Sequence, residues 1–259
     1  MNVMDDISVL ILTYNEEDNI GRTLSALTGF PEIVIVDSNS TDQTAEIVAR
    51  FPNARLVARA FDNHAAQWNY GLAQCNRSWI LALDADYVVS PELIDEIRHL
   101  GPLGDISGYR IGFRYCIHGR PLRGTLYPPV VAFYRRERAY YVQHGHTQRA
   151  IIDGRVDEMK ARIDHDDRKP LARWIASQQK YARLEMDHIL AQPRKNRRRI
   201  DRIRLLGWAA PPLVFIYTLF VKGCLLDGRP GWFYTLQRTV AECMMALDLI
   251  ERRLRERSR

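Results

Sequence analysis

Two carboxylates separated by one residue, Asp84 and Asp86, follow a run of apolar residues, 79–83. The run has the length and composition of a strand buried in a sheet. A bare carboxylate is costly to bury, so acids at the end of such a strand are solvated, paired or bound to a cation. Two acids at this spacing can hold one hard cation while a diphosphate supplies further oxygens, as in many Mg²⁺ sites. The alternative is a turn with ordinary surface acids, and the spacing alone does not separate the two.

Two further polar clusters, residues 13–16 and 37–40, also occur where apolar runs end. The first hundred residues alternate short β-type runs with helical patterns, which predicts a parallel sheet wrapped by helices. The expected strands are 7–12, 33–37, 54–58 and 79–86, and the expected helices are 18–27, 45–51 and 62–74. Ligands of such sheets bind beyond the carboxyl ends of the strands. Three polar clusters at one edge therefore predict a binding site rather than three unrelated turns.

Composition and short motifs narrow the class of protein. The chain contains neither GxGxxG nor GxxxxGK[ST], so the dinucleotide fingerprint and the P-loop are absent. Its 259 residues suffice for one large domain or two small ones. A net charge of +6 and a pI near 9.2 predict an anionic partner, whether nucleic acid, a nucleotide phosphate or an anionic membrane. Four scattered cysteines favour a reduced, cytosolic compartment, and the acidic N-terminus predicts no secretory signal.

Three segments, ISVLILTYNEE (7–17), EIVIVDSNSTD (32–42) and LDAD (83–86), resemble the family 2 glycosyltransferases with the GT-A fold. The bacterial lipopolysaccharide-core glucosyltransferase type is the most similar group, and the resemblance is specific over residues 7–100. It implies an α/β fold whose mostly parallel sheet is flanked by helices. It also implies inverting transfer from a nucleoside-diphosphate sugar, with UDP as the expected nucleotide and Mg²⁺ or Mn²⁺ as cofactor.

The resemblance also implies roles for single residues. The nucleotide would be held by Thr13, Asn15, Glu16 and Asp37, the sugar end of the donor by Asp84, and the metal by Asp86. A metal in that place offsets the charge that builds up on the departing diphosphate, as a Lewis acid does.

The next segment, 108–156, turns to strand patterns and is rich in arginine. Strands are expected at 109–116, 130–134 and 140–142, and they would form the acceptor half of the site. Most of these arginines are expected to be surface charges. A few could bind phosphate, because a guanidinium makes bidentate contacts to it.

The general base is the point at which this sequence departs from the family. In related enzymes a Val-His-Glu-like segment supplies the base, and a later histidine completes the metal shell. His146 matches the histidine of the Val-His-Glu-like segment, but Thr147 occupies the position of its glutamate. His165 matches the later histidine and is therefore the expected further metal ligand. Either His146, Asp166 or Asp167 deprotonates a sugar hydroxyl, a contribution of about 10²–10⁴ in rate, or the acceptor is an already ionised polyprenyl phosphate.

The last third predicts helices. An amphipathic helix is expected over 171–190, and it is followed by a basic run, 194–204, and an apolar stretch, 205–226, that Pro211 and Pro212 interrupt. A bilayer-spanning helix needs about 20 apolar residues, and basic residues flank both ends of this stretch, against the positive-inside rule. We therefore expect helices in the membrane interface or a shallow re-entrant pair. The alternatives are a buried helix in a soluble domain or homo-oligomer, and nucleic-acid binding, which the lack of interleaved aromatics disfavours.

The sequence thus predicts a GT-A catalytic domain over 1–168, with a nucleotide-sugar half at 7–100 and an acceptor half at 108–168, and a membrane-associating helical region over 169–259. The predicted function is transfer of a sugar to a lipid-linked cell-envelope glycan at the cytoplasmic face of the bacterial inner membrane, without nucleic acid as a partner. Two alternatives stay open: a polyprenyl-phosphate glycosyltransferase, and a non-catalytic membrane-bound scaffold with a degenerate transferase fold.

Overall fold

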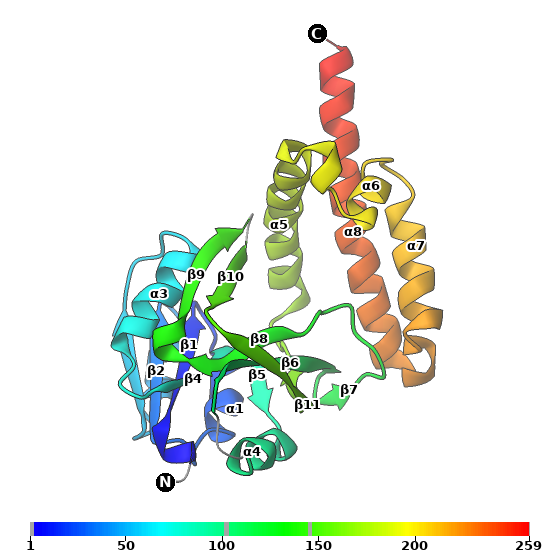
Figure 1. The fold of residues 1–259 in the computed structure, drawn as a ribbon. Coiled ribbons are helices and arrows are strands. Elements are labelled where there is room, and N and C mark those ends of the chain that lie inside the picture. Colours follow the sequence, from blue (N-terminus) through cyan, green and yellow to red (C-terminus); the bar gives the residue numbers. More distant parts are fainter. Residues whose placement is uncertain (1–2, 101–103, 145–146, 259) are drawn as a thin grey trace. The chain divides into compact units, whose positions relative to one another are not determined.

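The fold is taken from a computed structural model, which describes residues 3–100, 104–144 and 147–258 (Figure 1). The chain divides into two compact units, and each is described by itself. The catalytic unit comprises Met1–Gly119 and Tyr127–Arg168, and the helical unit comprises Arg120–Leu126 and Lys169–Arg259. The short segment Arg120–Leu126, which lies within the predicted acceptor half, therefore groups with the C-terminal helices.

The catalytic unit is built on one mixed sheet in the order β3-β2-β1-β4-β8-β6-β11-β5. Its strands are β1 (Ile7–Thr13), β2 (Glu32–Asp37), β3 (Ala54–Ala58), β4 (Trp79–Asp84), β5 (Tyr87–Val89), β6 (Ile106–Ile117), β8 (Val130–Arg135) and β11 (Arg155–His165). The first four in this order, from β3 to β4, pair in parallel, as the alternating sequence pattern predicts. Strand β8 runs antiparallel to both β4 and β6, and β11 runs parallel to β6. A separate hairpin joins β9 (Ala139–His144) to β10 (Thr147–Ile152).

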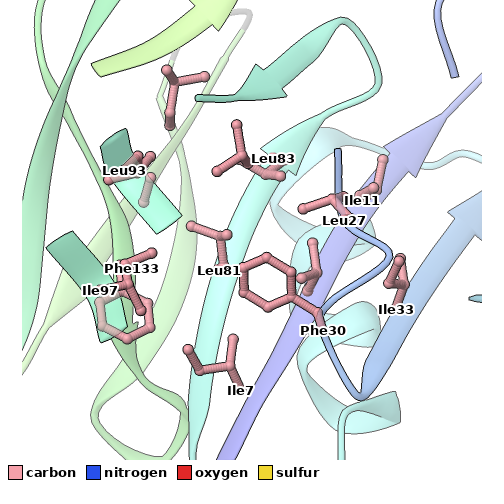
Figure 2. Packing of buried hydrophobic residues seen from close by; sticks show 14 of the residues in the cluster. Ile7, Ile11, Leu27, Phe30, Ile33, Leu81, Leu83, Leu93, Ile97 and Phe133 are labelled. Carbon is pink, nitrogen blue, oxygen red and sulfur yellow. The ribbon is translucent and has the colours of Figure 1, made fainter. Parts of the chain in front are cut away.

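Helices cover both faces of the sheet. They are α1 (Ile20–Ser25), α2 (Thr44–Val48), α3 (His64–Gln74) and α4 (Pro91–Arg98). Alternate residues of β1 point to opposite sides: Val9 and Ile11 pack with α1, α2 and α4, whereas Leu10 packs with α3 and the hairpin. Figure 2 shows the first of these cores, where Phe30 and Leu81 meet. Buried apolar runs on β1, β2 and β4 therefore fix the strands whose ends form the site.

Local signals explain where two of these helices begin. Helix α3 starts at His64, two residues later than predicted, because the Asn63 side chain accepts the Ala66 N–H at 2.9 Å and caps it. Helix α4 was not predicted, although Ser90 caps it and Pro91 occupies its first turn.

The α-helices of the helical unit are α5 (Leu171–Ala191), α6 (Arg199–Arg204), α7 (Ala210–Ile216) and α8 (Arg229–Arg257). Met186 and Ile189 of α5 pack against Met245 and Leu249 of α8, the long helix that ends at the C-terminus in Figure 1. Within the residues that the structure describes, no helix combines the length and the apolar character needed to cross a membrane.

Candidate active site

The carboxyl ends of β1, β2 and β4 lie side by side, which brings the three predicted polar clusters to one edge. Thr13 pairs with Asp37 across the β1–β2 ladder, and Leu12 pairs with Asp84 across the β1–β4 ladder. Thr13 Oγ1 donates to Asp37 Oδ1 at 2.8 Å, and the Ser40 N–H donates to Asp37 Oδ2 at 2.8 Å. Asp37 is only 4% exposed, so these donors hold its carboxylate in one orientation.

Asn15 and Glu16 join the two loops beyond this edge. Asn15 has a φ of 54°, a left-handed conformation that asparagine tolerates better than most residues. Its side-chain Oδ1 accepts the Thr41 N–H at 2.7 Å, and the Glu16 N–H donates to Thr44 Oγ1 at 2.7 Å. The Asn15 side chain therefore fastens the loop after β1 to the loop after β2.

Asp86 meets His165 although 79 residues separate them in the chain. His165 is the last residue of β11, and its Nε2 lies 3.1 Å from Asp86 Oδ2. A backbone hydrogen bond joins the same two segments, because the Asp166 N–H donates to the Asp86 carbonyl oxygen at 3.1 Å. Both side chains are largely buried, at 13% exposed for Asp86 and 8% for His165. The structure thus brings together the two residues predicted to bind a metal.

Four aromatic rings surround the His165 imidazole. Its centroid lies 4.6 Å from that of Tyr115, 4.8 Å from Tyr127, 5.1 Å from Tyr87 and 6.3 Å from Phe113. Its second nitrogen, Nδ1, is buried and has no hydrogen-bond partner among the described residues. The rings fix the plane of the imidazole and keep Nε2 directed at Asp86.

The charge of His165 depends on the acids around it. Burial alone lowers its pKa, but the nearby carboxylates of Asp86, Asp84 and Asp167 outweigh burial, and the net pKa lies above the ordinary 6.5. A cation is thus favoured at the point where Nε2 meets Asp86. A proton on His165 or a bound metal ion would supply that charge.

Asp84 lines a cavity of about 320 Å³ beside the end of β4. Tyr87 also lines this cavity and is hydrogen-bonded to Asp84. Its burial, and to a smaller extent the charges of Asp84 and Asp86, raise the pKa of Tyr87 well above 10. Its hydroxyl therefore stays protonated and can donate. On another wall Trp68 stacks on Tyr141, with ring centroids 5.1 Å apart. A cavity of this size with a few polar groups is typical of a small-molecule site.

Asp166 and Asp167 have different surroundings, although they are adjacent. Asp166 is 4% exposed; its Oδ1 accepts the Gly119 N–H at 3.0 Å, and its Oδ2 accepts from Arg168 Nε at 2.9 Å and lies 3.7 Å from Arg22 Nε. Asp167 is less buried, and its Oδ1 accepts from the neutral Asn19 side chain at 2.9 Å. Accepting a proton on Asp166 would mean breaking contacts with cationic partners.

Asn19 is a site residue that the sequence did not indicate. It is fully buried, and its Nδ2 donates to Glu16 Oε2 at 3.0 Å and to Asp167 Oδ1 at 2.9 Å. Its Oδ1 accepts from Arg22 Nη2 at 3.0 Å and from the Arg168 N–H at 2.9 Å. One amide thus joins the loop after β1 to the loop after β11. A lone asparagine in a polar stretch carries no pattern that would reveal these long-range contacts.

The donor set suits a metal shared with a substrate rather than a closed metal site. No group of three or more His, Cys, Asp or Glu side chains able to hold a metal ion occurs among the described residues. Asp86 and His165 offer one carboxylate and one imidazole, and Mg²⁺ is commonly held by one or two protein ligands plus substrate phosphates. The two residues therefore fit a cation that a diphosphate helps to bind. His146, the remaining predicted residue, lies outside the described residues.

Comparison with protein families identifies the domain that carries this site. Residues 8–114 match the family model described as glycosyl transferase family 2. The chain contains a family 2 glycosyl transferase domain. This match covers β1, β2, β4 and the Asp84–Asp86 pair, so the predicted family is confirmed, and the mixed sheet flanked by helices has the predicted GT-A-like fold.

The chain is similar to several individual proteins. The chain is 26% identical over 255 residues to the lipopolysaccharide core biosynthesis glycosyltransferase LpsC of Rhizobium meliloti, covering 95% of this chain and 92% of LpsC. It is 34% identical over 98 residues to the uncharacterized glycosyltransferase RT0209 of Rickettsia typhi, covering 38% of this chain and 33% of that protein. The chain thus spans about a third of the length of RT0209. A crystal structure of S. aureus TarS 1-349 in complex with UDP-GlcNAc is 18% identical, with a TM-score of 0.49, and the match covers 92% of this chain and 81% of that one.

Proposed function

We propose that this protein transfers a sugar, with inversion, from a UDP-sugar to a lipid-linked cell-envelope glycan. The observation that carries the proposal is the 3.1 Å contact between Asp86 and His165 at the sheet edge that Asp84, Thr13 and Asp37 share. Two strands distant in sequence converge on a half-built cation site next to a cavity, which suits a diphosphate–metal complex.

The proposed cofactor is Mg²⁺ or Mn²⁺, held by Asp86 and His165. When bound, it would supply Lewis-acid stabilisation of the departing nucleoside diphosphate. The protein's own contribution is orientation, since the aromatic rings around His165 fix its Nε2 towards Asp86. The imidazole must lose its proton before it can bind the metal.

The proposed donor site extends from the metal ligands to the loops after β1 and β2. Thr13, Asn15, Glu16 and Asp37 are proposed to hold the nucleotide, with Asn15 keeping the two loops together. Asp84 is proposed to bind the sugar, because it borders the cavity of about 320 Å³.

Asp167 is a better candidate than Asp166 for the general base. The oxygens of Asp166 already accept from Arg168 and from the Gly119 N–H, and its side chain is almost fully buried. Asp167 is less buried, so an acceptor hydroxyl can reach its oxygens more readily. His146 remains a prediction.

Two arginines in the lining of the cavity suit an anionic acceptor. Arg110 and Arg149 both line it, and a guanidinium is well suited to phosphate. A phosphorylated glycan would satisfy this lining and needs a base for its attacking hydroxyl. A polyprenyl phosphate could also bind the two arginines, and its ionised phosphate would attack without a base. The two arginines therefore keep polyprenyl phosphate as the second candidate acceptor. Product analysis with each acceptor separates the two, and transfer only to polyprenyl phosphate would overturn the glycan.

The helical unit is proposed to lie on the cytoplasmic face of the bacterial inner membrane. Its exposed side chains include many large apolar residues: Leu206, Trp208, Leu213, Ile216, Tyr217, Phe220, Val221, Leu225, Leu226, Trp232 and Phe233. So much exposed apolar surface is unusual for a soluble monomer, and tryptophan beside basic residues is typical of a membrane interface. A homo-oligomer would be an alternative cover for this surface.

The test is donor hydrolysis with a panel of nucleotide sugars, measured for the wild type, Asp86→Asn and Asp95→Asn. Asp95 is an exposed carboxylate on α4, so its variant controls for the loss of one acid. We expect slow hydrolysis of one UDP-sugar that chelation and Asp86→Asn abolish and Asp95→Asn leaves intact. Equal activity in all three proteins would refute the proposed role of Asp86.

If the protein is instead a non-catalytic scaffold, the opposite results are expected. It would bind no donor by calorimetry, and Asp86→Asn would keep full biological function. Either result would replace the transferase proposal.

A further inference from the structure

The turn between α5 and α6 forms a hollow lined almost entirely by cations. Arg194, Lys195, Arg197 and Arg202 surround a volume of about 450 Å³, together with Leu205. We call these five residues the basic hollow. All of them belong to the helical unit.

The basic run of the sequence divides into neutralised and non-neutralised residues. Arg204 donates to both carboxylate oxygens of Glu242, at 2.9 and 2.6 Å, and Arg198 pairs with Asp201 at 3.1 Å. By contrast, Arg194, Lys195 and Arg202 make no ion pair within the part of the chain that the structure describes. One ion pair thus holds α6 against α8 and another closes the first turn of α6, while a second set of cations lines the hollow.

Arg197 is fixed in place without being neutralised. Its Nε donates to the Gln192 carbonyl oxygen at 3.1 Å, and its Nη2 donates to that of Leu190 at 3.3 Å. These carbonyls end α5, so the guanidinium caps the helix and keeps its positive charge at the hollow. A fixed cation costs less ordering entropy when it binds an anion.

A distant segment brings one more cation to the same place. Arg253 of α8 donates from Nη2 to the Leu205 carbonyl oxygen at 2.7 Å. Immediately after Leu205 in the chain, Leu206 and Trp208 are 55% and 73% exposed. The basic hollow therefore adjoins exposed apolar side chains, an arrangement suited to the phosphate and acyl regions of a lipid.

We propose that the basic hollow binds the phosphate groups of anionic phospholipids and thereby positions the helical unit on the bilayer. This inference rests on the proposed membrane association. Guanidinium groups bind phosphate bidentately, and an exposed tryptophan lies favourably at headgroup level. All four cations belong to the helical unit, the part of the chain proposed to contact the membrane.

The test compares two charge-matched variants of the full chain. Arg194→Gln/Lys195→Gln removes one arginine and one lysine from the hollow. Lys180→Gln/Arg183→Gln removes the same pair from the exposed surface of α5, where neither residue makes an ion pair with a described residue. Each protein is sedimented with vesicles of phosphatidylcholine alone, and with vesicles of equal parts phosphatidylcholine and phosphatidylglycerol.

We expect the wild type to prefer the anionic vesicles, the hollow variant to lose about 30-fold in partitioning, and the control to lose at most about threefold. Equal losses would show that net charge, not the hollow, is recognised. Binding of free pyrophosphate as strong as binding to vesicles, and lost in the hollow variant, would overturn the lipid assignment. Binding of the wild type to neither vesicle would refute the membrane association itself.

Donor hydrolysis separates this inference from the transferase proposal. The hollow lies outside the catalytic unit, so the hollow variant should hydrolyse the UDP-sugar at the wild-type rate. Loss of hydrolysis in the hollow variant, with the fold intact by circular dichroism, would contradict a purely lipid-binding role.

Discussion

Replacing Asn19 by aspartate tests whether its amide holds the site together. The substitution keeps the size of the side chain but exchanges two N–H donors for a carboxylate oxygen. That oxygen would face the acids that the amide now joins, Glu16 Oε2 at 3.0 Å and Asp167 Oδ1 at 2.9 Å. Asn19 is fully buried, so water does not screen the resulting repulsion.

The expected loss in the free energy of unfolding follows from these contacts. Each hydrogen bond to a charged group contributes about 1.5–3 kcal/mol, and Asn19→Asp removes two of them. The introduced charge gains attraction to Arg22, whose Nη2 lies 3.0 Å from the Asn19 oxygen. We therefore expect the free energy of unfolding to fall by about 3 kcal/mol.

Urea unfolding followed by circular dichroism measures this loss. The introduced carboxyl should have a raised pKa in the folded state, so the destabilisation is full above that pKa and is relieved as the pH falls through it. Asn196→Asp, at an exposed position, adds the same charge and should change stability by less than about 0.5 kcal/mol. An Asn19→Asp protein as stable as the wild type at pH 8 would refute the assigned role of the amide.

Three further predictions concern other parts of the chain. The pKa of His165 is raised, so a proton competes with the metal for its imidazole. Mn²⁺ affinity should therefore rise about tenfold per pH unit below that pKa and level off above it. A pH-independent affinity in calorimetry would argue against His165 as a ligand. Gly71→Ala would place a Cβ 2.6 Å from Leu10 Cδ1 and should lower the free energy of unfolding by about 1–3 kcal/mol, whereas Gly29→Ala, with its nearest atom 3.9 Å away, should have little effect. Tyr234→Phe leaves the Leu126 N–H without its 2.9 Å acceptor, so thermal melting should show a loss of about 1–3 kcal/mol, and an unchanged melting curve would mean that water replaces the hydroxyl.

The site edge was predictable because its signal is local. The apolar runs of β1, β2 and β4 each end in polar residues, and a parallel sheet places such ends together. The hydrogen bond between Thr13 and Asp37 is the direct result. The two acids at the end of β4, Asp84 and Asp86, were recognisable for the same reason.

Other parts of the site carried no local signal. Strand β11, which presents His165, lacks strict alternation because its pairing with β6 shifts register between Glu158 and Arg162. Asn19 reaches Asp167 across 148 residues, and no spacing rule covers such a distance. The difference between Asp166 and Asp167 likewise depends on partners such as Gly119 that only the folded chain brings near.

Mn²⁺ titration in the presence and absence of UDP tests whether Asp86 and His165 form part of a metal site. If Asp86 and His165 form half of a site that a diphosphate completes, UDP should strengthen Mn²⁺ binding at least about tenfold, and Asp86→Asn should abolish that gain. Strong Mn²⁺ binding without UDP, or a UDP effect that survives Asp86→Asn, would contradict the account.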